Sequence, residues 1–264
     1  MFSVVIPLYN KEISINKTLE SVLGQTFSNF EVVLVNDGST DGSLGVARSI
    51  SDSRIRIIDQ QNGGVSSARN KGIEEASYEW IVFLDADDLW KPNHLETINN
   101  MIIKFPDDDV FCTSFIRSTE SLPVEQDGTI SIIEDYFEEA IKYHFFWTSV
   151  TAIKKSVFSD IGVFNERLSR GEDLDLWARI GKKYRFIRSK EVTAIYVQDS
   201  DNKLSFTKTS LNKSILNNIS FDGLNKSQKA YFKRLIFRKI RSCALKGDLG
   251  VLMKLILKYN VNLL

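Results

Sequence analysis

The sequence predicts an α/β fold with a central, mostly parallel mixed sheet and a C-terminal helical appendage. Strand and helix signals alternate over about the first 105 residues, an order typical of a parallel sheet wrapped by helices. A length of 264 residues suits one large domain plus a small appendage. Charge is divided unevenly, since residues 181–264 hold 18 Lys and Arg against 5 Asp and Glu within a chain of zero net charge. This asymmetry favours a phosphate-rich partner surface, and solvated helix faces are the alternative.

Composition excludes several classes of protein. The chain has no low-complexity tract and no internal repeat. Its two cysteines, Cys112 and Cys243, lie far apart, which predicts no disulfide framework and a reducing compartment. No signal peptide is recognisable, and no apolar run approaches the ~20 residues that span a bilayer. We expect a cytoplasmic protein, either soluble or peripheral on the cytoplasmic face of the membrane.

The first half of the chain supplies four strands with helices between them. Each strand is a short apolar run, and the first ends at Pro7, which cannot continue a hydrogen-bonded ladder. Apolar side chains at a spacing of 3.6 mark the first helix, and Pro92 suits the first turn of a later one. The expected strands are residues 3–7, 31–35, 54–58 and 80–84, and the expected helices begin near residues 15, 65 and 92.

Polar and glycine-rich segments follow all four strands, at residues 7–10, 36–38, 61–64 and 85–87. The carboxyl ends of parallel strands lie at one edge of a sheet, where α/β proteins bind their ligands. Asn, Asp, Gly and Ser are also the usual turn formers, so each segment alone is explained by turn chemistry. Their convergence predicts one site.

Three carboxylates crowd the end of the fourth strand, at Asp85, Asp87 and Asp88. Along an extended chain Asp85 and Asp87 point the same way, and such close like charges repel unless a cation or a donor lies between them. Mg²⁺ and Mn²⁺ prefer carboxylate oxygens, and Mg²⁺ often bridges protein carboxylates to substrate phosphates. The alternative is an acidic turn in which Asp88 caps the next helix.

Residues 107–204 carry weaker signals. The sequence predicts strands at 110–115, 149–153 and 193–197, a turn at 127–128 and a short helix at 133–142. The aromatic run Phe145-Phe146-Trp147 fits either the wall of an acceptor groove or the core, and such clusters are more often core.

Five motifs occur in order along the chain: VVIPLYN at 4–10, VNDGSTD at 35–41, GVSSARN at 64–70, FLDADD at 83–88 and GEDLDLW at 171–177. Together they resemble family 2 of the inverting glycosyltransferases, of the type that builds bacterial polysaccharide. The resemblance covers about residues 2–105 continuously and resumes near residue 171. It implies the Rossmann-like A-type glycosyltransferase fold, with a nucleotide-sugar-binding half at 1–105 and an acceptor-binding half of the same domain at 106–204. The sequence pattern adds a basic helical segment at 205–264.

The resemblance also implies roles in binding a nucleotide-sugar donor. Tyr9 would stack on uracil beside Pro7. Asp37 would accept a hydrogen bond from the base N–H, which suits a carboxylate facing an imide. Arg69 would contact the phosphates or hold the metal-binding carboxylates, with Asn62 close by.

The fourth-strand motif implies the rest of the donor site. Asp85 would bind the ribose hydroxyls, with Ala86 also at the donor, and Asp87 would hold the Mn²⁺ or Mg²⁺ that neutralises charge developing on the departing nucleoside diphosphate. Family members often carry a histidine after the strand predicted at 193–197, but this chain has QDSD at 198–201, which leaves further metal ligands open. The absence of a Gln-x-x-Arg-Trp sequence points to transfer of a single sugar.

In this family the position of Asp173 is that of the general base, which takes the proton from the acceptor hydroxyl. Asp173 and Glu172 open a helix, where the helix dipole favours negative charge. Partial burial beside Trp177 would raise the pKa of Asp173 toward the working pH. We assign Glu172 to orientation, although charge complementation at a helix N-terminus also explains it.

The C-terminal segment, from about Ser205, is predicted to be helical, basic and amphipathic. Basic amphipathic helices are typical of proteins that bind membrane surfaces. Helices that pack on the acceptor half and shield it are the alternative. The expected apolar stripe consists of Phe232, Leu235, Ile236, Ile240 and Ala244, and a second stripe follows Gly247 at Leu249, Leu252, Leu255 and Ile256.

We therefore expect an inverting, metal-dependent hexosyl- or N-acetylhexosaminyl-transferase. It would move one sugar from a UDP-linked donor to a glycan or lipid-linked glycan, without a nucleic-acid partner. One alternative is a phosphatase of the haloacid dehalogenase type, but its Asp-x-Asp normally follows the first strand. Another is a catalytically silent sugar-nucleotide-binding module, which would lack Asp87 or Asp173.

Overall fold

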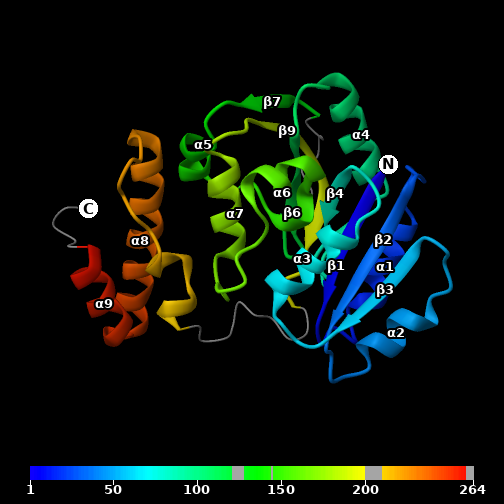
Figure 1. Cartoon of the computed structure of the whole chain (residues 1–264), viewed down its shortest axis with the longest axis horizontal. Coiled ribbons are helices and arrows are strands. Elements are labelled where there is room, and N and C mark those ends of the chain that lie inside the picture. The colour runs from blue at the N-terminus through cyan, green and yellow to red at the C-terminus, as the bar shows by residue number, and fades with distance from the viewer. Residues whose placement is uncertain (121–127, 144, 200–209, 260–264) are drawn as a thin grey trace.

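The structure is a computed structural model that describes residues 1–120, 128–143, 145–199 and 210–259. Its centre is a mixed sheet of nine strands in the order β3-β2-β1-β4-β8-β6-β9-β5, with β7 paired to β9 (Figure 1). The first four strands are parallel, and β8 lies antiparallel between β4 and β6. The predicted α/β fold with a mostly parallel mixed sheet is confirmed. The strands are β1 (Phe2–Leu8), β2 (Phe30–Asp37), β3 (Ile55–Gln60), β4 (Trp80–Phe83), β5 (Leu89–Trp90), β6 (Val110–Arg117), β7 (Ile130–Ile133), β8 (Thr151–Lys154) and β9 (Phe186–Tyr196).

Helices cover the sheet, with α3, α6 and α7 in front of it and α1 behind it in Figure 1. The two C-terminal helices, α8 and α9, lie at the end of the molecule away from β3. The α-helices are α1 (Ile15–Leu23), α2 (Ser43–Ser49), α3 (Val65–Glu75), α4 (His94–Lys104), α5 (Tyr136–Lys142), α6 (Lys155–Ile161), α7 (Glu172–Ile180), α8 (Lys226–Lys246) and α9 (Leu249–Tyr259), and the 3₁₀ turns are η1 (Thr148–Val150), η3 (Leu211–Lys213) and η4 (Ile215–Asn217).

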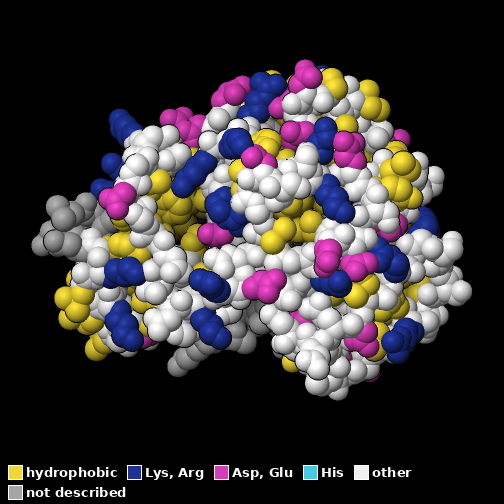
Figure 2. Space-filling model, in the orientation of Figure 1, with side chains coloured by type: hydrophobic (Ala, Val, Ile, Leu, Met, Phe, Trp, Pro, Cys, Tyr) yellow, Lys and Arg dark blue, Asp and Glu magenta, His cyan; other side chains and the backbone are white. Residues whose placement is uncertain are grey.

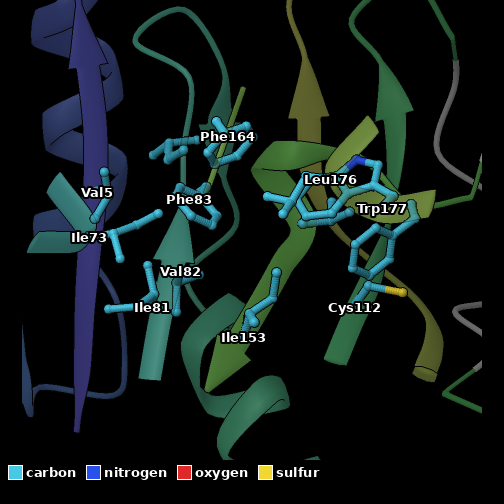
Figure 3. Packing of buried hydrophobic residues seen from close by; sticks show 14 of the residues in the cluster. Val5, Ile73, Ile81, Val82, Phe83, Cys112, Ile153, Phe164, Leu176 and Trp177 are labelled. Carbon is cyan, nitrogen blue, oxygen red and sulfur yellow. The ribbon is translucent and has the colours of Figure 1, made fainter. Parts of the chain in front are cut away.

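Helix α3 packs unusually close to the centre of the sheet, at Gly72. A Cβ atom at this position would lie 2.2 Å from Cγ1 of Val5, a fully buried residue of β1. Figure 3 shows the packing continue from Val5 and Ile73 at one end of the core to Cys112 and Trp177 at the other. The close approach fixes the position of α3 against β1.

The observed strands correct some of the predicted boundaries. β1 continues past Pro7 to Leu8, because its pairing with β4 ends at Val5 and only β2 remains as a neighbour at the proline. Strands β5 and β7 were not predicted, because they are short and pair with β9, which is distant in sequence. The helix expected from residue 133 begins three residues later, after β7. Residue 127 of the predicted turn lies outside the described residues.

The long helix α8 packs on the body of the protein. It begins with a capping box formed by Asn225 and Gln228. The rings of Tyr231 and Phe137 lie 5.5 Å apart, and Tyr231 and Phe232 are buried between α8 and α5. The packing expected as the alternative to membrane binding is thus present on this face of α8.

The predicted apolar stripes are only partly buried. Phe232, Ile236 and Leu255 are buried, but Ala244 is exposed and Cys243 takes the buried position next to it. The predicted start of this segment near Ser205 falls outside the described residues. Among the helices that the structure describes, none is long and apolar enough to cross a membrane.

Candidate active site

Two cavities meet beyond the carboxyl ends of the central strands. The first has a volume of about 330 Å³ and the second of about 500 Å³, and Trp147, Asp173 and Tyr196 line both. The first cavity is further lined by Pro7, Leu8, Tyr9, Lys11, Asp37, Asn62, Gly64, Val65, Ala68, Arg69, Asp85, Ala86, Asp87, Thr148 and Glu172. The second is further lined by Ser114, Phe115, Arg117, Glu120, Tyr143, Phe145 and Arg188.

The first cavity brings together all but one of the site residues that the sequence predicted. The exception is Trp177, which is fully buried in the core, where its ring packs edge-to-face on Phe146 at 4.8 Å. Phe145 and Phe146 are buried as well, whereas Trp147 is half-buried and lines both cavities. The aromatic run is therefore mostly core and contributes one residue to the site.

Asp37, at the end of β2, holds the turn that opens α3. Its carboxylate accepts hydrogen bonds from the backbone N–H groups of Gly63 and Gly64 and from Nε2 of Gln60, each at 2.8 Å. Asn62 donates to the backbone carbonyl of Asp37 at 2.9 Å. A carboxylate has about four acceptor positions, so Asp37 retains about one for a ligand.

Tyr9 stands at the mouth of the first cavity with 37% of its surface exposed. The next residue, Asn10, has a φ of 50°, in the left-handed region that most side chains disfavour. Its side-chain oxygen accepts from the backbone N–H of Thr40 at 2.7 Å, and its own N–H donates to Oγ of Ser39 at 3.1 Å. These bonds join the loop after β1 to the loop after β2 and fix the position of Tyr9.

Arg69 on α3 is the central cation of the first cavity, although only 4% of it is exposed. It forms ion pairs with Asp85 at 2.7 Å and with Glu172 at 3.1 Å. Burial lowers the pKa of Arg69, but the two carboxylates outweigh burial and raise it. Arg69 thus links the segment after β4 to the start of α7 and holds one carboxylate of each.

Asp87 forms an ion pair with Lys11 at 2.8 Å, and both side chains are largely buried. The sequence analysis did not single out Lys11, because a lysine in a loop after a strand is usually a solvated surface residue. Among the described residues, no group of three or more His, Cys, Asp or Glu side chains is placed to hold a metal ion. A single carboxylate on the cavity wall does fit an ion whose other ligands are oxygens of a diphosphate, an arrangement that is common for Mg²⁺.

Asp88 does not cap the next helix, so that part of the acidic-turn alternative is wrong. Only 2% of Asp88 is exposed, and its carboxylate accepts from Oγ of Ser149 at 2.6 Å and from the backbone N–H of Val197 at 3.3 Å. Burial raises its pKa well above the usual range, and the charges of Asp85 and Asp87 add to this effect. Asp88 joins the end of β4 to η1 and to the end of β9.

Asp173 lies in the first turn of α7, where the two cavities meet. Its carboxylate accepts from the backbone N–H of Leu174 at 2.8 Å. Burial raises its pKa above the usual range, although the Leu174 N–H and the guanidinium of Arg69 lower it. Burial and the adjacent Asp173 also raise the pKa of Glu172. Asp175 points elsewhere and pairs with Arg179 at 3.0 Å.

The second cavity contains residues that the sequence analysis did not assign to the site. Arg188 and Tyr196 belong to β9, Arg117 to β6, and Tyr143 follows α5. The available signal was weak: Arg188 directly follows the apolar pair Phe186-Ile187, but the same strand also carries Lys190 and Glu191, so the pattern does not distinguish Arg188 from a surface residue.

Comparison with known proteins shows which family this chain is similar to. Residues 3–162 match the family described as Glycosyl transferase family 2. The chain is 40% identical to Glycosyltransferase GlyA of Streptococcus pneumoniae over 108 residues, which are 40% of this chain and 16% of GlyA. It is 31% identical to an uncharacterized glycosyltransferase of Rickettsia bellii over 225 residues, which are 83% of this chain and 32% of that protein. The chain thus spans less than half the length of these relatives.

The fold is similar to that of S. aureus TarS. The crystal structure of TarS 1–349 in complex with UDP-GlcNAc gives a TM-score of 0.67 with 22% sequence identity, over 79% of this chain and 62% of that one. The structure of TarS 1–349 gives 0.64 with 18% identity, over 98% of this chain and 91% of that one. This similarity shows the A-type glycosyltransferase fold that the motifs predicted.

Proposed function

The chain belongs to glycosyl transferase family 2, and on that premise we propose that it is an inverting glycosyltransferase with Asp173 as its general base. One observation carries the proposal: Asp173 lines both cavities, so it lies where a donor in the first and an acceptor in the second would meet. Its raised pKa brings it nearer to the range in which a carboxylate is an effective base.

The proposed donor is a UDP-linked sugar bound in the first cavity. Tyr9 offers an aromatic face at the cavity mouth, and Asp37 retains acceptor capacity for a base N–H. TarS, which has this fold, has been crystallised in complex with UDP and with UDP-GlcNAc. The ribose and the diphosphate would then lie toward Asp85 and Asp87, which line the same cavity.

The reaction follows from this placement. The acceptor hydroxyl attacks the anomeric carbon from the side opposite the diphosphate, and its proton passes to the Asp173 carboxylate as the new glycosidic bond forms. The bond between the anomeric carbon and the diphosphate oxygen breaks, and the configuration at that carbon inverts. Arg69 keeps Glu172 and Asp85 in position beside the base. Transfer of a single sugar remains a proposal based on the sequence.

A divalent cation, Mn²⁺ or Mg²⁺, would be held by Asp87 together with the diphosphate, and would supply Lewis-acid stabilisation of the leaving group. Lys11 already lies against Asp87, so we propose that the ion binds with the nucleotide and only weakly without it. The alternatives set out from the sequence have less support. Asp85 is paired with Arg69 at the end of the fourth strand, and both Asp87 and Asp173 are present.

Replacing the base with its amide tests the catalytic proposal. Asp173→Asn should lower turnover by ~10²–10⁴-fold at saturating donor and acceptor, because the proton acceptor is lost while size is kept. UDP affinity measured by calorimetry should change by no more than a few fold. Asp175→Asn is the matched control on the same helix, since Asp175 pairs with Arg179. Near-normal turnover by Asp173→Asn would refute the assignment.

We also propose that the C-terminal helices contact an anionic membrane surface on the cytoplasmic side, where the acceptor would be a lipid-linked glycan. Residues 226–259 contain ten Lys and Arg against one Asp. Leu249, Met253 and Leu257 lie four residues apart on α9 and are 66%, 53% and 75% exposed. Figure 2 shows apolar side chains over α9 beside Lys and Arg. An exposed apolar stripe within a basic surface is complementary to anionic lipid.

Vesicle sedimentation tests this contact. The protein should bind vesicles that contain phosphatidylserine and not vesicles of phosphatidylcholine alone, and the Leu249→Asp/Leu257→Asp double variant should bind at least about 10-fold less. Ile103→Asp is the control, because Ile103 is 70% exposed on α4. If the double variant sediments as wild type does, α9 is not the contact surface.

A further inference from the structure

The second cavity contains two arginines with different partners. Nη1 of Arg117 forms an ion pair with Glu120 at 2.8 Å, and both residues line the cavity. Their charges cancel within the wall. The remaining charged residues of this wall are Asp173 and Arg188. Apart from Asp173, Arg188 is therefore the charged residue of this wall whose charge no other lining residue cancels.

Arg188 forms no ion pair with any residue that the structure describes. Its Nη2 donates to Oγ of Ser114 at 3.1 Å, and its Nη1 donates to the hydroxyl of Tyr143. Its Nε is buried and has no hydrogen-bond partner. The nearby Glu139 is engaged by Lys142 at 2.8 Å and by the Tyr143 hydroxyl at 2.6 Å. Two of the five N–H donors of Arg188 are thus used, and its charge is not neutralised by a direct contact.

Neutral groups hold this arginine in place. The guanidinium carbon lies 4.9 Å from the ring centre of Tyr143 and 5.7 Å from that of Phe145. Cation–π contacts and neutral hydrogen bonds orient a guanidinium without cancelling its charge. Such a fixed, positively charged fork is suited to a carboxylate or a phosphate.

The wall near Asp173 is aromatic. The rings of Trp147 and Tyr196 lie 4.0 Å apart between centroids, and Phe115 packs edge-to-face on Trp147 at 4.7 Å. Aromatic side chains with a polar edge offer apolar surface to the C–H face of a sugar ring. The second cavity thus combines a surface for a sugar, a base at the entrance to the first cavity and an unneutralised cation.

We propose that the acceptor carries an anionic group, a phosphate or a carboxylate, which binds Arg188 while the acceptor hydroxyl lies at Asp173. This inference rests on the proposed function. The negative charge of Asp173 disfavours an anion beside it, and Arg188 attracts one, so the two charges together orient the acceptor. Arg188 is then a residue that determines acceptor specificity.

Binding of three matched probes tests the proposal without catalysis. Saturation-transfer NMR with glucose 1-phosphate, glucuronate and methyl glucoside, in the presence of UDP and Mn²⁺, separates phosphate, carboxylate and neutral ligands. At least one anionic probe should bind about 10-fold more tightly than methyl glucoside. Arg188→Met should remove that preference, which corresponds to a loss of about 10-fold in affinity for the anion, and Arg188→Lys should restore part of it.

Two further variants keep the result interpretable. Arg117→Met should have a much smaller effect, because Glu120 already neutralises Arg117, and Ser114→Ala should keep the preference, because the guanidinium remains. The proposal is overturned if methyl glucoside binds as tightly as both anions, or if Arg117→Met weakens anion binding as much as Arg188→Met does. Failure of the proposed function is separate, since it would appear as absent UDP binding or an active Asp173→Asn variant. If Arg188→Met misfolds, the proposal is tested by the wild type and Arg188→Lys alone: the wild type should prefer an anionic probe, and Arg188→Lys should show a smaller preference.

Discussion

The charged side chains of the first cavity form ion pairs and hydrogen bonds with one another, whereas the guanidinium of Arg188 in the second cavity has no carboxylate partner among the residues that the structure describes. Arg69 has two carboxylates within 3.1 Å, and three donors surround Asp37. Arg188 has a hydroxyl on each side and two aromatic rings. The first cavity is thus organised before a ligand arrives, and the second retains charge for its ligand. If the first cavity binds the donor and the second the acceptor, as we propose, the donor geometry is fixed in advance and the charge of Arg188 contributes to acceptor specificity.

Removal of the central arginine on each side is the strongest test of this difference. Arg69→Met would leave Asp85 and Glu172 without their counter-ion and should lower the free energy of unfolding by about 3–5 kcal/mol. Arg188→Met breaks only neutral contacts and should lower it by about 1 kcal/mol. Urea unfolding monitored by circular dichroism measures both values. Equal losses would show that the two cavities do not differ in preorganisation.

Loss of one hydrogen-bonding oxygen should also destabilise the protein more in the first cavity than in the second. Asp37→Asn places an amide against the N–H groups of Gly63 and Gly64 or loses the bond to Gln60, and should lower the free energy of unfolding by roughly 1–3 kcal/mol. Tyr143→Phe removes a single hydroxyl from the second cavity and serves as the comparison. If Tyr143→Phe lowered the free energy of unfolding more than Asp37→Asn does, the first cavity would not be the more preorganised of the two.

The pH dependence of turnover probes the point at which the cavities meet. Burial raises the pKa of Asp173, and in the proposed mechanism Asp173 takes a proton only when it is ionised, so turnover should fall as pH decreases through this raised pKa. The midpoint of the fall in turnover on the acid side should therefore lie above pH 3.8, the ordinary pKa of an aspartate. Below that midpoint turnover should fall about tenfold per pH unit. Asp175→Asn should leave the midpoint in place. A midpoint at or below pH 3.8 would mean that the group is not desolvated in the working enzyme.

The smallest effect is expected at Asp87, the proposed metal ligand in the first cavity. Lys11 competes with a cation for Asp87, so Lys11→Met should tighten Mn²⁺ binding in the absence of nucleotide by about five-fold. Electron paramagnetic resonance of free Mn²⁺ measures this affinity directly. The exposed Lys17 provides the matched control, Lys17→Met. Unchanged or weaker Mn²⁺ binding would contradict the role given to Lys11.

The same contrast explains what the sequence could predict. Most of the predicted residues of the first cavity stand at the end of, or directly after, β1, β2, β3 or β4, so they appear in polar segments that follow apolar runs. Tyr143, Arg188 and Tyr196 of the second cavity come from a helix end and from the interior and end of one long strand. β9 reaches the cavity by pairing with β6, and the paired residues, such as Phe111 and Ile187 or Arg117 and Tyr196, are 76 to 79 positions apart, a separation that no local pattern encodes. Lys11 was missed because its partner, Asp87, lies 76 residues away.

Gly72 bears on how the enzyme tolerates mutation. It carries no functional group and lines neither of the two cavities, yet any side chain there meets Val5 and displaces the helix that carries Arg69. In a library of random substitutions, loss of activity at Gly72 would be as complete as at the acidic residues. A screen that ranks positions by lost activity would thus place an inert glycine among the catalytic groups, and only a measurement of folding would separate them.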